Sequence, residues 1–362
     1  MTDAVDYGLL AMVAEDMYSP TAPTGSQASL YPTPDARIAA AGWTVAAYLT
    51  AQDAVLPPRG AAVRTMGIDH GRRVFYGFVA RSAAAPPALP SYVVAIRGTE
   101  GFVEWVIDAE FNPVPHPRYP NARVEQGFWG IYQTMSLADP ATGVTTHQNA
   151  AEGVEELVGA SPVAVTGHSL GSALATYFTD DLAARIGAQA SACLFASPRT
   201  GDPTWTGLFD GHVGSYQLYN YIIDLVPHVP SLGYATLPRA TVLQPDSAQA
   251  DIRLDLLCNH HVVCYCAMID YAKTQAAMTP CPAADASEWE CVIGPYSPLP
   301  NSAKALAFIV NEAGITSDKA IALLKALHPD AVIKLAPAPP VAVAAAGPGV
   351  TPAPPSQNRP AG

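Results

Sequence analysis

The sequence predicts an α/β fold in which a mostly parallel central sheet is flanked by helices. Apolar runs typical of buried strands alternate with helical patterns through the middle of the chain, and a single serine stands where one such strand meets the next helix. Alternation of strand and helix is the arrangement from which parallel sheets are built. The predicted strands cover residues 162–167, 191–198 and 215–224, and the predicted helices cover residues 149–159 and 172–187.

The first hundred residues predict one helix followed by three strands. Apolar residues recur at helical spacing between Asp3 and Met17, which predicts a helix there. Three apolar segments then follow, separated by Pro and Gly, and each predicts a strand. These segments are residues 42–49, 72–81 and 91–98.

The character of the chain changes after residue 298. Two segments that begin at Asn or Ser and end at Gly or Pro predict a small helical appendage over residues 299–334. Residues 335–362 are Ala, Pro and Gly with hardly a charge, which predicts a disordered tail. We therefore expect one large domain over residues 1–298 followed by these two parts.

The composition disfavours several classes of protein. The chain carries 19 Lys and Arg against 31 Asp and Glu, a formal net charge of −12, so we expect no nucleic-acid partner. It contains no run of about 18 apolar residues, so we expect no transmembrane segment. Only 14% of its residues are charged, which suits a lipid-handling protein. The acidic N-terminal segment is not a secretory signal, so the compartment is unknown and a cytoplasmic protein is the default expectation.

The pentapeptide GHSLG at residues 167–171 fits the G-x-S-x-G nucleophile elbow. A predicted strand leads into it and a helix of small residues leads out, which is the context that the elbow requires. Its two glycines give clearance to the neighbouring strand and helix while the serine takes a strained backbone conformation. The alternative is an ordinary strand-to-helix turn. We predict that Ser169 is a nucleophile.

A serine nucleophile needs a histidine base supported by an acid, and in this fold both follow the serine in the chain. Asp224 ends a predicted strand, which places its carboxylate at the edge of the sheet beside the elbow. The alternative for Asp224 is a loop-capping role before the Pro-rich turn. The histidines beyond Asp224 include His228, which is too close to the acid in sequence, and His328, which lies in the appendage. His260 or His261 remains as the base.

With these motifs in view, the sequence resembles the class 3 lipases, the fungal-lipase-like branch of the α/β hydrolases. Four stretches between about Tyr92 and Asp270 carry the resemblance in the order of the family. They read VVAIRGTEGFVEW, VAVTGHSLGSALA, FASPRTGDPTW with YNYIIDLVPHVP, and CNHHVVCYCAMID. The resemblance implies the α/β-hydrolase fold.

The resemblance also implies roles for individual residues. The Arg-Gly-Thr motif assigns one oxyanion-hole residue to Thr99, and the position after the nucleophile assigns the second to Leu170. The acid of the family falls on Asp224. A tyrosine five residues after the histidine in the family pattern favours His260 over His261. One departure is VEQGFWGIY, where Glu125 and Gln126 stand in the place at which relatives often have a histidine.

In the family, the segment after Arg-Gly-Thr is a helical lid over the active site. Here it reads EGFVEWVIDAEF, in which Phe102, Trp105 and Val106 gather on one face of a helical wheel and acidic residues on the other. We expect these three apolar residues to cover the pocket and to contact substrate. The alternative is a fixed surface helix with its apolar face in the core.

The cysteines admit two further interpretations. Cys281 and Cys291 bracket a polar loop and form the most plausible disulfide pair. A zinc site is the alternative for the residues around 258–266, with Cys281 and Cys291 as a second ligand pair. The apolar residues between those cysteines and histidines favour a core segment instead. We therefore expect neither a metal nor an organic cofactor.

Together these features predict a serine carboxylic-ester hydrolase, a lipase that cleaves acylglycerol esters through an acyl-enzyme intermediate, acting on an ester or lipid substrate at a lipid–water interface. A short-chain esterase or a phospholipase with the same site is one alternative. A non-catalytic binding module on a hydrolase fold is an alternative of another class.

Overall fold

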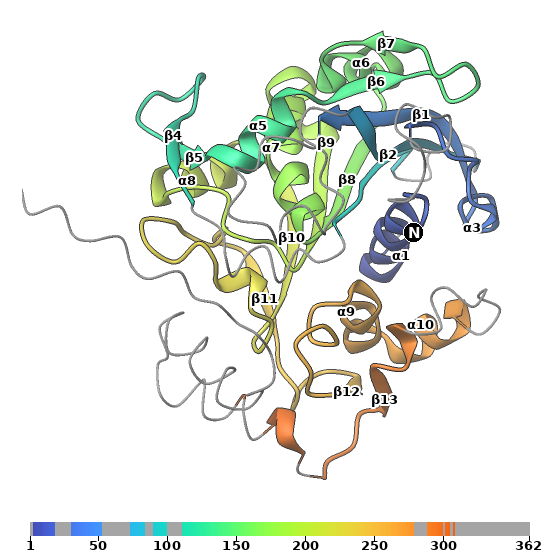
Figure 1. Cartoon of the computed structure of the whole chain (residues 1–362), viewed down its shortest axis with the longest axis vertical. Helices are drawn as coiled ribbons and strands as arrows, with labels where there is room; N and C mark the ends of the chain where they lie inside the picture. Colours follow the sequence, from blue (N-terminus) through green and yellow to red (C-terminus); the bar gives the residue numbers. More distant parts are fainter. Residues whose placement is uncertain are drawn as a thin grey trace, which may run out of the picture.

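In the computed structural model the central element is one nine-stranded sheet with helices on both faces (Figure 1). The structure describes residues 3–18, 30–52, 73–83, 90–99, 111–278, 288–299, 301–304 and 307. The strand order is β11-β10-β9-β8-β3-β2-β1-β6-β7. The predicted α/β-hydrolase architecture, a central sheet flanked by helices, is confirmed.

Half of the sheet is parallel and the other half is antiparallel. The parallel strands are β3 (Tyr92–Ile96), β8 (Val163–His168), β9 (Ala190–Phe195), β10 (Ser215–Tyr221) and β11 (Ala240–Leu243). The antiparallel strands are β1 (Trp43–Gln52), β2 (Arg73–Ser82), β6 (Ser136–Ala138) and β7 (Thr145–His147). The connections between β2 and β3 and between β6 and β7 are too short for a parallel crossover, so these two pairs depart from the predicted parallel order.

The helices form two layers. Helix α1 packs on β8, β3 and α9, and helix α7 packs on β8 and β9 together with α5 and α6. Figure 1 shows α1 and α9 on one side of the sheet and α7 on the other. The helices are α1 (Ala4–Asp16), α3 (Ala36–Ala40), α5 (Gln126–Gln133), α6 (Ala150–Val158), α7 (Leu170–Ile186), α8 (Pro203–His212), α9 (Val262–Ile269) and α10 (Tyr271–Met278), with short 3-10 turns η2 (Gly187–Gln189) and η3 (Val226–His228).

Helix α1 forms where the sequence predicts it, and most of its surface is buried. A capping box at Asp3 and Asp6 satisfies its first backbone N–H groups. Apolar residues surround the helix axis because α1 lies between the sheet and α9, so both of its faces are covered. This placement brings the last turn of α1 to the end of β3.

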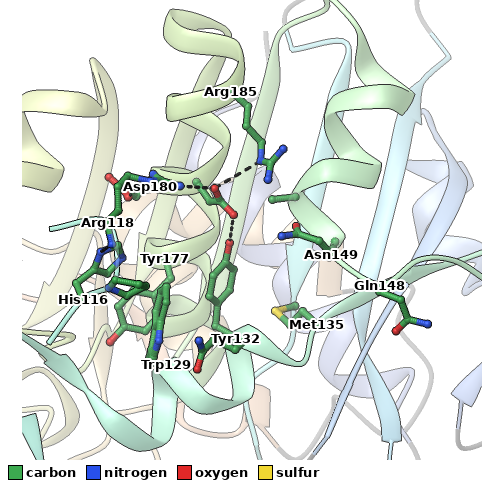
Figure 2. Close-up of a pocket in the computed structure, with 15 residues that line it drawn as sticks. His116, Arg118, Trp129, Tyr132, Met135, Gln148, Asn149, Tyr177, Asp180 and Arg185 are labelled. Carbon is green, nitrogen blue, oxygen red and sulfur yellow. Dashed lines mark hydrogen bonds and ion pairs between the residues drawn. The ribbon is translucent and has the colours of Figure 1, made fainter. Parts of the chain in front are cut away.

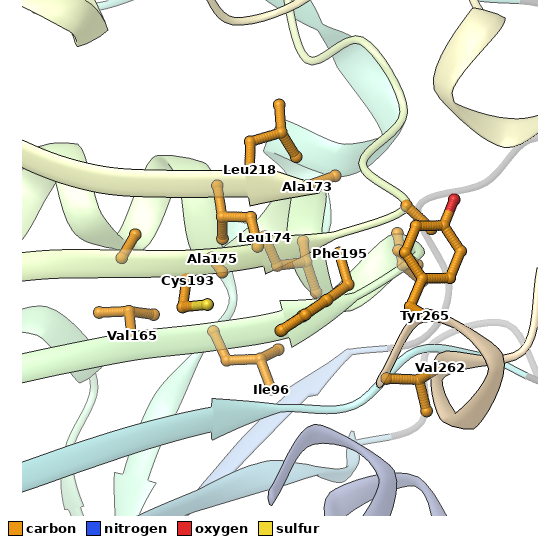
Figure 3. Close-up of a cluster of buried hydrophobic side chains, with 14 of the residues drawn as sticks. Ile96, Val165, Ala173, Leu174, Ala175, Cys193, Phe195, Leu218, Val262 and Tyr265 are labelled. Carbon is orange, nitrogen blue, oxygen red and sulfur yellow. The ribbon is translucent and has the colours of Figure 1, made fainter. Parts of the chain in front are cut away.

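Small residues on α7 let it approach the sheet closely. Figure 3 shows Ala173, Leu174 and Ala175 beside Val165 and Phe195, and all five side chains are inaccessible to solvent. Methyl-sized side chains on a helix allow its backbone to pack close to the strands, where dense contacts stabilise the core. The start of α7 is therefore held firmly against the ends of β8 and β9.

The disulfide differs from the predicted one. Cys291 is bonded to Cys258, and not to Cys281, which lies outside the described residues. The reason is the antiparallel pairing of β12 (Ala250–Ile252) with β13 (Val292–Pro295). This pairing brings Cys291, which directly precedes β13, close to the segment after β12 that contains Cys258. The spacing of the cysteines in the sequence does not indicate this strand pair.

The remaining elements lie at the margins of the domain. A second small ribbon pairs β4 (Pro113–Pro115) with β5 (Arg123–Glu125). No helix within the described ranges combines the length and the apolar character that a bilayer-spanning segment needs. Most of the predicted appendage at 299–334 and all of the predicted tail at 335–362 lie outside the described residues.

Candidate active site

Ser169 occupies the tight turn between β8 and α7. Its backbone has φ 59° and ψ −127°, a positive φ that is costly for a residue with a side chain. A Cβ atom on Gly171 would collide with the carbonyl oxygen of Ile96, and one on Gly167 would collide with the backbone of Gly171. The two glycines are therefore needed for the close approach of strand and helix at the elbow.

The structure brings Ser169, His260 and Asp224 into one hydrogen-bonded chain. His260 Nε2 lies 2.8 Å from Ser169 Oγ, and His260 Nδ1 lies 2.8 Å from Asp224 Oδ2. The serine follows β8, the aspartate follows β10, and the histidine precedes α9. All three side chains are almost fully buried. The arrangement allows a proton to pass from the hydroxyl to an imidazole that the carboxylate orients.

His261, the other candidate base, faces away from this chain. Its Nδ1 lies 3.1 Å from Glu288 Oε1, and it stands at the N-cap of α9. The two adjacent side chains have different partners, since His260 contacts Ser169 and Asp224 whereas His261 contacts Glu288. The structure thus places His260, and not His261, beside Ser169 and Asp224.

Asp224 is held by two donors besides His260. The backbone N–H of Val226 donates to Oδ1 at 3.0 Å, and the hydroxyl of Tyr265 donates to Oδ2 at 2.7 Å. The same Tyr265 oxygen accepts a hydrogen bond from the backbone N–H of Tyr221. Tyr265 therefore contacts the acid directly, a role that the sequence did not indicate.

The environment lowers the pKa of His260. Burial disfavours its charged form, and the positive charge of the neighbouring His168 acts in the same direction. Asp224 opposes both because it stabilises the imidazolium. The resting state is therefore the neutral imidazole, which is the form that can accept a proton from Ser169.

Thr99 and Leu170 lie after neighbouring strands. Ile96 of β3 pairs with Gly167 of β8, and Thr99 and Leu170 each follow three residues later. Leu170 is the first residue of α7, so its backbone N–H is one of the unpaired donors at a helix start. The two residues thus follow paired positions on adjacent strands.

Two residues near Ser169 were not identified from the sequence. His168 Nδ1 lies 2.9 Å from Glu15 Oε1, and its Nε2 lies 2.6 Å from the backbone oxygen of His260. The signals were an acidic residue that interrupts an apolar helix and a histidine inside the elbow motif. Neither reveals that the two meet.

The other predicted features are placed as follows. Phe102, Trp105 and Val106, the predicted lid residues, lie outside the described residues. Glu125, at the departure from the family pattern, is buried and caps α5 by accepting the Phe128 N–H at 2.7 Å. Because His260 contacts Asp224 and Cys258 is in a disulfide, the zinc alternative loses ligands to other partners.

A cavity of about 510 Å³ lies elsewhere, among α5, α6 and α7 (Figure 2). Figure 2 shows Trp129, Tyr132 and Tyr177 gathered around it. Its charged lining is paired, since Arg118 lies 3.2 Å from Asp180. None of the triad residues lines this cavity. The catalytic geometry and the cavity are separate features of the molecule.

Comparison with known proteins identifies relatives of this chain. Residues 93–234 match the family model described as lipase (class 3). The chain is 31% identical over 241 residues to phospholipase A1-II 5 of Oryza sativa subsp. japonica, covering 59% of this chain and 51% of that protein. It is 29% identical over 148 residues to the lipase of Rhizomucor miehei, covering 40% and 39% of the two proteins.

The chain thus spans about half of the length of the first of these curated relatives and about two fifths of the second. Among solved structures, a fungal lipase is similar with a TM-score of 0.45 and 20% identity, over 66% of this chain and 78% of that one. The matched segment begins in β3 and includes Thr99, Ser169, Leu170 and Asp224. Over residues 93–234 the chain is therefore similar in sequence to the class 3 lipase family.

Proposed function

We propose that this protein is a serine carboxylic-ester hydrolase, a lipase that cleaves acylglycerol esters. The observation that supports it best is the hydrogen-bonded chain from Ser169 through His260 to Asp224, with the serine on a strained elbow. Each side chain in this hydrogen-bonded series has the partner that acyl transfer requires. The family match over residues 93–234 supports the same chemistry.

In the first half of the reaction, Ser169 Oγ attacks the ester carbonyl carbon while His260 Nε2 takes the hydroxyl proton. The C–O bond to the alcohol then breaks, and His260 returns the proton to the departing oxygen. An acyl group remains on Ser169. Asp224 stays ionised and stabilises the imidazolium during both transfers.

In the second half, water takes the place of the alcohol. His260 removes a proton from the water, the resulting hydroxide attacks the acyl carbon, and the bond to Ser169 Oγ breaks. The proton returns to Ser169, and the carboxylic acid leaves. The backbone N–H groups of Thr99 and Leu170 stabilise the negative oxygen of both tetrahedral intermediates, an interaction of about 3 kcal/mol for each donor.

The relatives and the composition support the proposed substrate class. Relatives carry the names lipase and phospholipase A1, which share acyl esters of glycerol as substrates. The low content of charged residues suits contact with lipid, and we place the reaction at a lipid–water interface. The phospholipase alternative is favoured by one specific observation, the name shared by several relatives.

The experiment compares three substrates with one catalytic control. Initial rates are measured on emulsified triacylglycerol, on phosphatidylcholine vesicles and on p-nitrophenyl esters of two to eighteen carbons. A lipase hydrolyses triacylglycerol and long p-nitrophenyl esters fastest, whereas a phospholipase prefers the vesicles and an esterase prefers the shortest esters. Ser169→Ala, assayed beside the wild type, identifies any rate that comes from a contaminant.

The non-catalytic alternative makes a different prediction. A binding module has no need of a base within hydrogen-bonding distance of Ser169, and it hydrolyses none of the three substrates. Equal rates for the wild type and Ser169→Ala on all of them would therefore favour the binding module and reject the proposed hydrolase.

A further inference from the structure

Both ring nitrogens of His168 face hydrogen-bond acceptors. Nδ1 lies 2.9 Å from the Glu15 carboxylate, and Nε2 lies 2.6 Å from the backbone carbonyl oxygen of His260. A carboxylate and a carbonyl can only accept, so both contacts are satisfied only when each nitrogen carries a proton. His168 is buried, and with Glu15 ionised this geometry corresponds to an imidazolium beside the base of the triad.

The electrostatics agree with this protonation state. Burial alone lowers the pKa of His168, but the Glu15 carboxylate outweighs it and raises that pKa above its ordinary value. Burial also acts to raise the pKa of Glu15. The charge and the hydrogen bond of His168 outweigh burial, so the pKa of Glu15 lies below its ordinary value. The pair thus exists as a carboxylate and an imidazolium near neutral pH.

The same oxygen of Glu15 also contacts the backbone just before Thr99. Glu15 Oε1 accepts the backbone N–H of Gly98 at 3.0 Å, and Gly98 immediately precedes Thr99. A Cβ atom at position 98 would collide with that oxygen, so a side chain there would displace the Glu15 carboxylate. One carboxylate from α1 therefore ties together the end of β3, the elbow histidine and, through it, the backbone of His260.

We propose that Glu15 and His168 form an ion pair that positions His260 and the turn carrying Thr99, which makes Glu15 a positioning residue for ester hydrolysis. The inference rests on the proposed function of Ser169, His260 and Asp224. Glu15 touches neither the substrate nor the reacting atoms. Through His168 it fixes the backbone of His260, and through Gly98 it fixes the position of Thr99.

The groups that face His168 set its pH response. Glu15 approaches from α1, Asp224 from the end of β10, and the carbonyl of His260 from the turn before α9. The rings of His260 and Tyr265 pack against it at 4.7 and 6.3 Å between centroids. As pH rises and His168 loses its proton, one of its two hydrogen bonds is lost. The rate constant kcat should therefore decline on the alkaline side.

The decisive variant is Glu15→Gln, compared with Asp16→Asn. The glutamine oxygen can still accept from Gly98 and His168, but the charge that keeps His168 protonated is gone. Asp16 is the next residue on α1 and pairs with Arg37 at the surface, so its variant changes the same charge away from the site. The quantity compared is kcat on a soluble ester, normalised to the active sites titrated with a phosphonate, across the pH range.

We expect the alkaline limb of kcat to move to lower pH in Glu15→Gln, with kcat falling about tenfold or more at mildly alkaline pH and little change in KM. Asp16→Asn should keep the limb of the wild type. A uniform loss of kcat at every pH without a shift of the limb would reduce Glu15 to a structural residue, and an unchanged profile would overturn the proposal.

A second measurement uses the wild type and needs no variant. In protein labelled with ¹⁵N at its nine histidines, one imidazole should carry protons on both nitrogens at about pH 7. A spectrum in which every histidine is neutral at that pH would refute the ion pair even if Glu15→Gln fails to fold. This result does not depend on hydrolysis, so failure of the proposed function and failure of the ion pair remain distinguishable.

Discussion

Tyr265 donates its hydroxyl hydrogen bond to the same oxygen of Asp224 that accepts from His260. The Tyr265 oxygen lies 2.7 Å from Asp224 Oδ2, and His260 Nδ1 lies 2.8 Å from it. The donor from tyrosine disperses negative charge on the carboxylate and also fixes its orientation. Tyr265 is itself fixed, because its oxygen accepts the N–H of Tyr221.

The first prediction concerns Tyr265→Phe. Removal of the hydroxyl leaves Asp224 Oδ2 with a single donor and a stronger interaction with His260, so the pKa of His260 should rise. The acid limb of kcat/KM should therefore move to higher pH. The free energy of unfolding should fall by about 1–3 kcal/mol, because the buried N–H of Tyr221 loses its partner. Rate profiles and urea denaturation measure the two effects, and an unmoved acid limb would contradict the prediction.

The second prediction separates the paired histidines. His260→Ala should lose several orders of magnitude in kcat because, among the described residues, His260 is the base that lies beside Ser169 Oγ. His261→Ala should retain most of the activity, because that ring contacts Glu288 at the surface. Steady-state hydrolysis of a soluble ester measures both. A reversal of the two effects would transfer the role of base to His261.

The third prediction concerns the disulfide. Cys258→Ser should lower the free energy of unfolding by about 3–4 kcal/mol, because the bond closes a loop of 33 residues in the unfolded chain. Cys281→Ser is the matched control and should have little effect, because Cys291 is already bonded to Cys258. Thermal or urea denaturation under non-reducing conditions measures both. A loss confined to Cys281→Ser would support the pairing rejected above.

The fourth prediction concerns Trp105 and the proposed lid, a segment known here from its sequence pattern alone. If its apolar face turns toward lipid, Trp105→Ser should reduce hydrolysis of emulsified triacylglycerol far more than hydrolysis of a soluble short-chain ester. The activity of the wild type should also rise abruptly when an emulsion forms. Equal losses on both substrates, with a smooth dependence on concentration, would identify a fixed helix.

The sequence predicted the elements that carry strong local patterns. The strand and helix around Ser169 were predicted to within a few residues, because buried apolar runs and small helix residues surround one motif. The short strands β4, β5, β6, β7, β11, β12 and β13 were not predicted. Three or four residues are too few to show a period, and their pairing is decided by tertiary contacts.

The site residues also divide into those that a local sequence pattern indicates and those that only tertiary packing brings to the site. Asp224 and His260 could be proposed because each stands at the end of a pattern that the fold explains. Glu15 could not, since 83 residues separate it from Gly98 and 153 separate it from His168. The contacts of Glu15 depend on where α1 packs against the sheet. The residue pattern of one helix does not show which residues lie beside its C-terminal turn.

The central claim is that Ser169 is a nucleophile activated by His260. Its most direct test is labelling with a serine-directed alkyl phosphonate, followed by mass spectrometry of the peptides. One phosphonate should attach to Ser169 in the wild type, in step with loss of ester hydrolysis, and labelling should be abolished in Ser169→Ala and slowed by several orders of magnitude in His260→Ala. An adduct on a different serine, or full hydrolysis by Ser169→Ala, would contradict the claim.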